Sequence, residues 1–233
     1  MILGLPGAGL ALAAYILTDN LSTAMIILGI TVGMVFVAHP DMRPFIVVAV
    51  AGVILIVIGV LFLVVTTKDS DSFRVMRVLV WLQPEKYSDE GGYQTLQALY
   101  AIGSGGLFGR GLGNSIQKLG SVPEAQNDMI FSIICEELGI FGGIFVLILF
   151  GYLLYRLFFI AQNAPDLFGS LIVTGIFIHI ALQVILNIAV VLNLMPNTGV
   201  TLPFISYGGT SILFLMLEMA IALSVARQIK FQE

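Results

Sequence analysis

The sequence predicts an all-α fold, a polytopic transmembrane helical bundle of about six spans with one long extracytoplasmic loop that contains short helices. Composition carries most of this prediction, because 58% of the residues are hydrophobic and only 10% are charged. A soluble domain has about a quarter charged residues and could not hide so much apolar surface from water. The apolar runs are also long and continuous, which favours membrane helices over the short alternating strands of an outer-membrane barrel.

The chain of 233 residues is predicted to form a single integral membrane domain, residues 1–233. Long apolar runs separated by short polar connections predict six membrane spans. The spans are expected at roughly 2–17, 21–38, 44–66, 129–158, 167–192 and 207–227.

The long connection between the third and fourth spans covers residues 67–127 and holds six of the ten Lys and Arg residues. A connection of this length inside a compact protein is usually functional or disordered. Its apolar content argues against disorder, since "SFRVMRVLVWL" at 72–82 predicts an amphipathic segment with Arg74 and Arg77 on one side. The stretch "YQTLQALYAIG" at 93–103 predicts a second short helix.

The orientation follows from the basic residues beside the short connections. With six alternating spans, four of these residues fall on one side, which should be the cytoplasm. They are Arg43, Arg156, Arg227 and Lys230. The long loop then lies on the extracytoplasmic side, and both chain ends lie inside.

Several classes of function are disfavoured by composition. The ten Lys and Arg residues are spread along the chain and form no basic face for a nucleic acid. Cys135 is the only cysteine, and its apolar surroundings predict a packing role. The two histidines, His39 and His179, are far apart, and no His and Cys pattern identifies a metal site.

Asp128 stands where the loop enters the fourth predicted span, and two interpretations remain open. Asn127 could be the N-cap of the helix, with Asp128 favoured in the first turn by the helix dipole. Alternatively, the carboxylate could act as a general base on a sugar hydroxyl of a lipid-linked substrate. It could also help to hold a divalent cation, Mg²⁺ or Mn²⁺, on phosphates.

The other acids near Asp128 have mainly structural interpretations. Ser121 and Glu124 fit a capping box, which predicts helix initiation for Glu124. Glu136 could share one broad helix face with Asp128, whereas Glu137 points roughly the opposite way. Because a carboxylate at membrane depth is costly, at least one of the pair should meet a buried partner.

Residues 101–115, "AIGSGGLFGRGLGNS", contain six glycines and one arginine. Backbone N–H groups around Gly105 and Gly106 could cradle a phosphate, or the glycines could simply permit tight turns. Arg110 and Lys118 are the better candidates for binding a substrate pyrophosphate, with Arg74 and Arg77 in support.

Residues 197–211, "NTGVTLPFISYGGTS", form a polar connection before the last predicted span. Gly208 and Gly209 are expected to supply conformational freedom, and Ser206 lies in the same supporting segment. A tight re-entrant connection buried in protein is the alternative interpretation. Outside this connection, His179 before it and Glu218 after it are expected to be buried hydrogen-bonding residues.

Three motifs in order resemble one family. They are "GYQTLQALYAIGSGGLFGRGLGNS", "PEAQNDMIFSIICEELG" and "TGVTLPFISYGGTS". Together they are similar to the shape, elongation, division and sporulation (SEDS) proteins FtsW, RodA and SpoVE, and the last motif resembles the FtsW/SpoVE branch. Family members have about ten spans, so the resemblance implies that this chain corresponds to the C-terminal part, without about the first four.

The resemblance implies a multi-pass protein of the bacterial cytoplasmic (inner) membrane that acts as a peptidoglycan glycosyltransferase. Such a protein polymerises lipid II into glycan strands on the extracytoplasmic side, with Asp128 at the position of the presumed catalytic acid. It works with a class B penicillin-binding protein and other division proteins. Two other functions stay open from the residues, a lipid II flippase and a non-catalytic membrane scaffold for a penicillin-binding protein.

Overall fold

The computed structural model describes residues 4–18, 20–38, 47, 54, 73–119 and 122–229. The predicted span at 44–66 therefore lies outside the described residues apart from two positions. Every regular element in the described part is helical, which confirms the all-α prediction. The elements are α1 (Gly4–Thr18), α2 (Leu21–Ala38), α4 (Phe73–Leu82), η1 (Ser88–Glu90), α5 (Gly92–Gly105), η2 (Gln117–Leu119), α6 (Ile130–Asn163), α7 (Leu167–Val191) and α8 (Gly209–Ala226).

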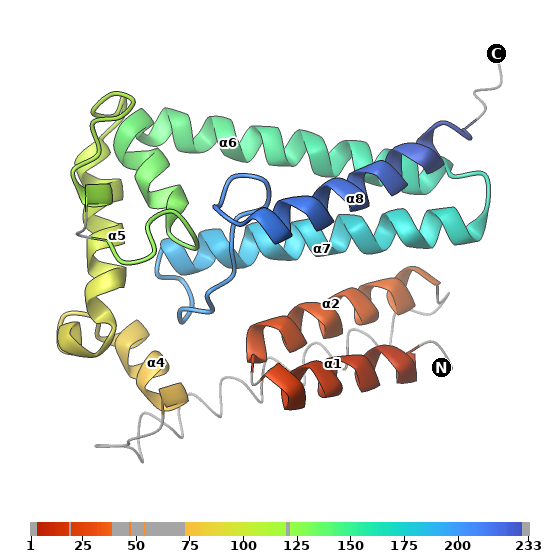
Figure 1. The fold of residues 1–233 in the computed structure, drawn as a ribbon, viewed down its shortest axis with the longest axis horizontal. Coiled ribbons are helices and arrows are strands. Elements are labelled where there is room, and N and C mark those ends of the chain that lie inside the picture. Colours follow the sequence, from red (N-terminus) through yellow and green to blue (C-terminus); the bar gives the residue numbers. More distant parts are fainter. Residues whose placement is uncertain are drawn as a thin grey trace.

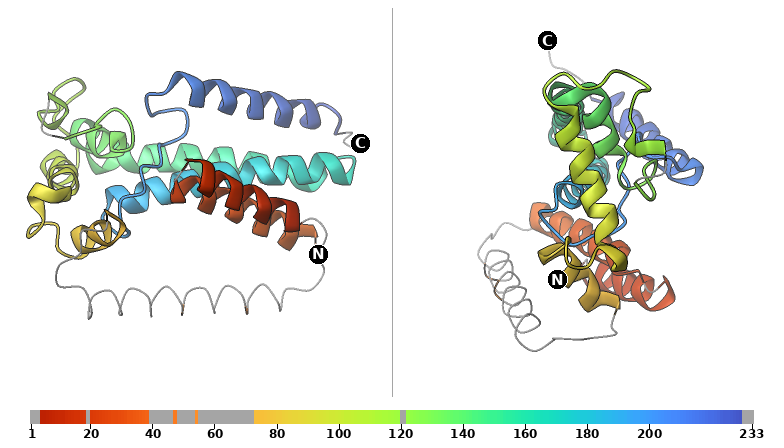
Figure 2. Two further views of the ribbon diagram at one scale, coloured as in Figure 1. Left: turned by 60° about the horizontal axis from the view of Figure 1, so that its bottom comes forward. Right: turned by 90° about the vertical axis from the view of Figure 1, so that its left-hand side faces the viewer.

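Four of these helices are long and apolar enough to cross a membrane, namely α2, α6, α7 and α8, and α1 is a shorter apolar helix. α6 and α7 run side by side, and α7 also contacts α8 and α2, which pairs with α1 (Figures 1 and 2). Short helices do lie within the long loop, as predicted. Of these, α5 runs across the ends of the long helices and packs on α6 (Figure 2).

Small residues allow α2 to approach α7 closely. A Cβ atom at Gly29 would lie 2.6 Å from Leu182, and one at Gly33 would lie 2.5 Å from Ile178. In lipid, where water provides no hydrophobic drive between helices, small residues that leave room for a neighbouring helix's side chains supply packing energy. The two glycines therefore help α2, and with it α1, to pack against α7.

α6 is not one straight helix. Gly139 has φ 72° and ψ −172°, which breaks the helix into an arm, Ile130–Leu138, and a longer segment at 140–163. A straight helix of 34 residues would be ~51 Å long, far beyond the ~30 Å hydrocarbon core. The 24 residues after the break are ~36 Å long and are sufficient to span.

This break changes the prediction of one continuous span at 129–158. Glu136 and Glu137 precede Gly139 and lie on the arm, and α6 packs against α5 of the long loop. Both acids thus come before the longer segment of α6.

Candidate functional site

Asp128 lies in the turn that precedes α6 and is not part of a cap. The N-cap of α6 is Met129, and it makes no side-chain capping hydrogen bond. The prediction that Asn127 caps the helix is therefore wrong, because the helix begins only at Ile130. Asp128 is nevertheless buried, with 8% of its surface exposed. A buried acid without a capping role needs another explanation.

Glu124 does not initiate a helix either. It lies in the same turn with φ 53°, a left-handed conformation that a helical first turn excludes, so the capping-box prediction is wrong. Ser121, the other half of the predicted box, is outside the described residues. The Glu124 carboxylate instead accepts a short hydrogen bond from the Asn127 side-chain amide.

A pocket of about 430 Å³ opens beside Asp128. Its lining comes from the turn before α6 and from the connection between α7 and α8. The lining residues are Glu124, Asn127, Asp128, Gly199, Thr201 and Tyr207. Two carboxylates, a hydroxyl and a phenol thus face one space, a set that suits a polar, hydroxyl-bearing substrate.

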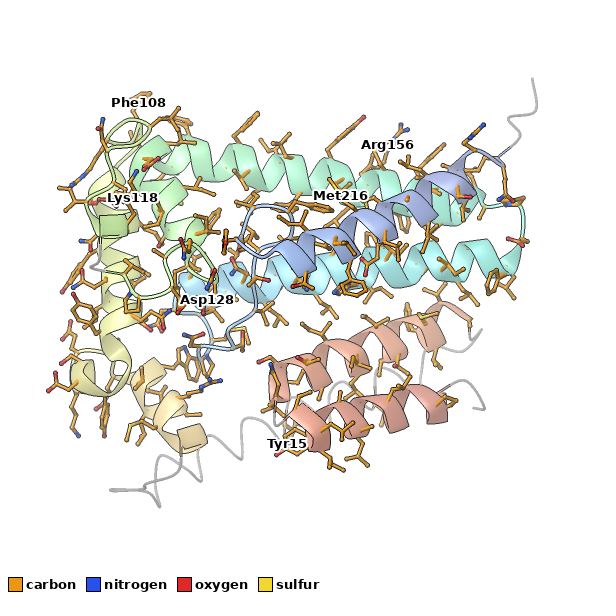
Figure 3. All side chains as sticks on the ribbon, viewed as in Figure 1. Tyr15, Phe108, Lys118, Asp128, Arg156 and Met216 are labelled. Carbon is orange, nitrogen blue, oxygen red and sulfur yellow. The ribbon has the colours of Figure 1, made fainter. Side chains whose placement is uncertain are left out.

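A chain of polar contacts links Asp128 to α5 and α4. The Gln94 amide nitrogen lies 3.4 Å from Asp128 Oδ1, and Gln94 Oε1 accepts from the Asn197 amide at 3.0 Å. The Asn197 carbonyl in turn accepts from Arg77 Nη1 at 3.3 Å. These contacts connect the Arg77 guanidinium to the Asp128 carboxylate through Asn197 and Gln94. Figure 3 shows Asp128 where these segments meet.

The backbone around Asp128 is fixed by the α7–α8 connection. Asn187, which is 1% exposed, donates to the carbonyls of both Asp128 (2.6 Å) and Val200 (2.8 Å). Ser206 Oγ donates to the Asn127 carbonyl at 2.6 Å and accepts from the Leu202 N–H at 2.7 Å. Ser206 and Asn187 thus both attach the turn before α6 to the α7–α8 connection.

Burial raises the pKa of the Asp128 carboxyl above its usual value. The carboxyl's own backbone N–H opposes this by lowering the pKa, the nearby Glu124 carboxylate raises it, and Arg77 lowers it. A raised pKa makes a carboxylate a stronger base. The environment therefore moves Asp128 toward the range where it can accept a proton.

Backbone strain gathers in the same two connections. Among the described non-glycine residues, only Glu124, Asn193 and Phe204 have a positive φ, at 53°, 55° and 63°. All three lie in the turn before α6 or in the connection after α7. Such conformations cost free energy and tend to occur at functional sites.

Arg110 and Lys118 lie in a different contact network. Lys118 Nζ is 2.6 Å from Glu137 Oε1, and Arg110 Nη1 is 3.6 Å from Glu136 Oε1. Glu136 is fully buried and accepts from the Ser115 hydroxyl at 2.5 Å. The expectation that at least one of the two glutamates meets a buried partner is confirmed. Asp128 and Glu136 both contact α5, Asp128 through Gln94 near its start and Glu136 through Ser104 near its end.

The glycine-rich segment packs against α6. A Cβ at Gly105 would lie 2.0 Å from the Cys135 carbonyl oxygen, and one at Gly109 would lie 2.2 Å from that of Glu137. Gly106, with φ 57°, meets no neighbour and ends α5. These contacts give Gly105 a packing role and Gly106 a turn role. Phosphate binding by this segment stays a prediction.

The structure says less about three other residues of the predicted site, Arg74, Gly208 and Gly209. The side chain of Arg74 lies outside the described part, although its backbone is in α4. Gly208 caps α8 with an extended φ of 166°, and a Cβ at Gly209 would meet nothing within 4 Å. Neither position has a backbone conformation that requires glycine. The expected conformational freedom is therefore not used at Gly208 or Gly209.

No group of three or more His, Cys, Asp or Glu residues that could hold a metal ion occurs within the described segments. Glu124 and Asp128 nevertheless line one pocket. Mg²⁺ is commonly bound by one or two carboxylates together with substrate phosphates and water. The pair fits that pattern.

The residues that the sequence left out are mostly amides. Gln94, Asn187 and Asn197 connect Asp128 to its surroundings, but they come from segments that are far apart along the chain. Asn187 alone carries a sequence signal, because it is a polar residue inside an apolar helix. Nothing local distinguishes Gln94 or Asn197.

A second polar group lies within the bundle. His179 Nδ1 of α7 is 3.0 Å from both carboxylate oxygens of Glu218 on α8, so the expected hydrogen bonding is present, but both side chains are only partly buried. The pair borders a cavity of about 520 Å³ whose other walls are mostly apolar residues of α2 and α7. This contact joins two helices and is separate from the Asp128 pocket.

Comparison with known proteins gives consistent relatives. Stage V sporulation protein E of Bacillus subtilis is 40% identical over 97% of this chain and 60% of its own length. The probable peptidoglycan glycosyltransferase FtsW of the same organism is 42% identical over 80% of this chain and 46% of its own length. The chain thus spans about half to three fifths of these curated relatives.

Solved structures agree on the fold. A chain from a peptidoglycan synthase complex, described for its structural coordination of polymerization and crosslinking, matches with a TM-score of 0.71 and 28% identity over 99% of this chain and 61% of that one. The rod shape determining protein RodA of Thermus thermophilus matches with a TM-score of 0.58 and 27% identity, over 99% and 56%. The family model for cell cycle proteins of the FtsW, RodA and SpoVE type matches residues 2–231. The chain therefore belongs to the FtsW/RodA/SpoVE family.

Proposed function

We propose that this chain carries the catalytic part of a peptidoglycan glycosyltransferase that polymerises lipid II during cell division or sporulation. The observation that carries the proposal is Asp128, a buried acid with a raised pKa that faces a polar pocket. Family membership and relatives named as glycosyltransferases support the choice of reaction.

The proposed chemistry is an inverting glycosyl transfer. The 4-hydroxyl oxygen of the acceptor sugar forms a bond to the anomeric carbon of the growing chain. The bond from that carbon to the lipid-linked pyrophosphate breaks, and the pyrophosphate leaves with the electron pair. Asp128 accepts the hydroxyl proton, which requires the carboxylate to be ionised before reaction.

The leaving pyrophosphate needs positive charge nearby. Arg77 is the best-placed cation among the described side chains, because it acts electrostatically on Asp128 and reaches the same polar network. Arg74, on the same helix, would assist. Arg110 and Lys118 would have to share their glutamate partners with the substrate, so we assign them a secondary role.

A divalent cation, Mg²⁺ or Mn²⁺, would be held by Glu124 and Asp128 together with the substrate phosphates. Bound there, it would supply Lewis-acid stabilisation of negative charge. With or without a cation, Glu124 and Asp128 line the pocket. Arg77 donates to the Asn197 carbonyl and so belongs to the polar contacts that reach Asp128.

The polarity of the bundle supports an active site on the extracytoplasmic side of the inner membrane. Arg156 lies toward the far end of α6 from Asp128 (Figure 3), and Arg227 ends α8. Basic residues beside short connections mark the cytoplasmic side. The Asp128 end then faces outward, where lipid II is polymerised.

A class B penicillin-binding protein is the proposed partner, with other division proteins. The support is the structural likeness to a chain of a peptidoglycan synthase complex that couples polymerization with crosslinking. A crosslinking partner would act on the strands that this protein makes.

The test is lipid II polymerisation by the complete gene product, reconstituted in vesicles, with Asp128→Asn. The amide keeps the size of the side chain but accepts no proton, so we expect a loss of about 10²- to 10⁴-fold. Glu85→Gln is the matched control, because Glu85 is an exposed acid outside the pocket, and it should keep its activity. Full activity of Asp128→Asn would remove Asp128 from catalysis.

The same vesicles separate the alternatives. A lipid II flippase would move lipid II across the bilayer without polymer formation and would do so in the Asp128→Asn variant. A scaffold would show neither activity and would retain binding to the penicillin-binding protein. Polymer from the unchanged protein that disappears in the variant supports the glycosyltransferase.

A further inference from the structure

The tip of the glycine-rich loop presents apolar side chains to its surroundings. Phe108 is 81% exposed and Leu107 is 56% exposed, although both belong to a well-packed segment of the long loop. A large contiguous patch of exposed apolar side chains marks a site of contact with protein or membrane.

Backbone hydrogen bonds attach this loop tip to α6. The N–H groups of Ile140 and Phe141 donate to the carbonyls of Gly106 (2.9 Å) and Leu107 (3.3 Å). These are the first residues of α6 after the break at Gly139. The loop tip is therefore tied to the point where the spanning part of α6 begins.

The exposed side chains continue the outer face of α6. The Phe108 and Phe141 rings pack in a tilted arrangement, with centroids 5.4 Å apart and an interplanar angle of 39°, and Phe108 lies on the outer side of α6 in Figure 3. Beyond Phe141, the same helix face remains exposed at intervals of three and four residues. Its members are Phe145, Ile148, Tyr152 and Tyr155. A spanning helix with such a face meets lipid along it.

The length of α6 sets the depth of the tip. From Ile140 to Arg156 the helix rises ~24 Å, and the Arg156 side chain can reach several Å further to the membrane surface. The hydrocarbon core is ~30 Å thick, so its other boundary falls at about Ile140. Leu107 and Phe108 then lie at the boundary between acyl chains and headgroups, where interfacial segments bury such apolar side chains.

We propose that Leu107, Phe108, Ile140 and Phe141, here called the Phe108 patch, insert into that boundary of the bilayer. The patch anchors the loop in lipid and thereby fixes the height of the arm Ile130–Leu138, which follows Asp128 directly. The occupant of this surface is the lipid bilayer. The inference depends only on the helix crossing a membrane and stands apart from the proposed enzymatic function.

Single-tryptophan fluorescence tests the proposal directly. Trp81 is the only tryptophan of these 233 residues, so Trp81→Phe, together with replacement of any other tryptophan in the complete gene product, gives a dark background. Phe108→Trp is placed in that background in the complete gene product and reconstituted in phosphatidylcholine vesicles. Bromine atoms on the acyl chains, near the headgroup or near the chain end, report depth. Tyr93→Trp, on the first turn of α5 and partly exposed, is the matched control.

We expect Phe108→Trp to lose most fluorescence to bromines near the headgroup, less to bromines near the chain end, and little to aqueous acrylamide. Tyr93→Trp should respond mainly to acrylamide. Equal bromine quenching of both variants, or acrylamide quenching of Phe108→Trp as strong as that of Tyr93→Trp, would overturn the proposal. Protection of Phe108→Trp from both quenchers would also overturn it, because protein would then cover the patch.

Discussion

At the scale of the residue, the Asp128 carboxyl is placed between opposing influences. Burial and the Glu124 carboxylate raise its pKa, whereas its own backbone N–H and Arg77 lower it. An acid that must be ionised to accept a proton loses activity as the pH falls through its pKa. The acid limb of the pH–rate profile should therefore lie above the usual range for aspartate.

Neutralising the two neighbours should move this limb in opposite directions. Glu124→Gln removes a negative charge, so ionised Asp128 becomes easier to form and the limb shifts to lower pH. Arg77→Gln removes a positive charge and shifts it to higher pH, while the amide can still donate to the Asn197 carbonyl. The measurement is polymerisation rate against pH, and shifts of the same sign in both variants would contradict the assignment.

The role of Asp128 shows where local sequence reasoning stops at this scale. A cap and a catalytic acid look alike beside the start of an apolar helix. The difference lies in the true helix start at Ile130 and in contacts from Gln94 and Asn187, which are 34 and 59 residues away. Only the family resemblance could favour the catalytic interpretation beforehand.

At the scale of the element, α6 depends on a single glycine. A Cβ atom at Gly139 would lie 2.3 Å from the Leu107 carbonyl oxygen, and the residue has φ 72°. Both the conformation and the space therefore exclude a side chain. The hydropathy of the segment predicted the helix, but it could not reveal the break, since glycines are common in membrane helices.

Replacing this glycine should disturb the loop more than the helix. We expect Gly139→Ala to lower the melting temperature in detergent and to loosen the loop, measured as faster proteolysis within residues 105–119. Gly151→Ala is the control on the same helix, because a Cβ there meets nothing within 4 Å. That variant should match or slightly exceed the parent in stability, since alanine favours helix over glycine. Equal effects from both substitutions would show that the break is not specific to Gly139.

The Asn187 side chain attaches α7 to the turn before α6. Asn187→Ala leaves the Asp128 and Val200 carbonyls without their donor, which should cost about 1–3 kcal/mol of stability. Asn163→Ala is the matched control, because Asn163 is exposed and donates only to the Phe159 carbonyl in its own helix. Thermal unfolding of both variants in detergent is the measurement. A loss of stability no larger than in the control would mean that Asn187 does not hold these segments together.

At the scale of the whole molecule, α8 is attached to α7 partly through one polar contact. His179 and Glu218 are the residues concerned, and both lie near the middle of their helices. A double-mutant cycle with His179→Ala and Glu218→Ala should give a coupling free energy of about 0.5–2 kcal/mol. Additive single effects would show that the contact contributes nothing of its own.

Hydropathy predicted the class of the molecule and the helices α1, α2, α7 and α8 to within a few residues. Hydropathy could not predict the arrangement of the long loop. α5 packs on α6 through Gly105, and the loop after α5 is held by the buried Glu136, whose partners Ser115 and Ile116 lie about 20 residues away. Such contacts depend on tertiary geometry and leave no periodic pattern in the sequence.

The order of synthesis gives the Asp128 pocket a further property. Part of its wall is Gly199, Thr201 and Tyr207, and Asn197 completes the polar chain from α4 and α5. A growing polypeptide that has already exposed Asp128 therefore lacks a closed pocket until some eighty more residues have left the ribosome. Chains that terminate before Tyr207 should contain the acid but lack part of the pocket wall.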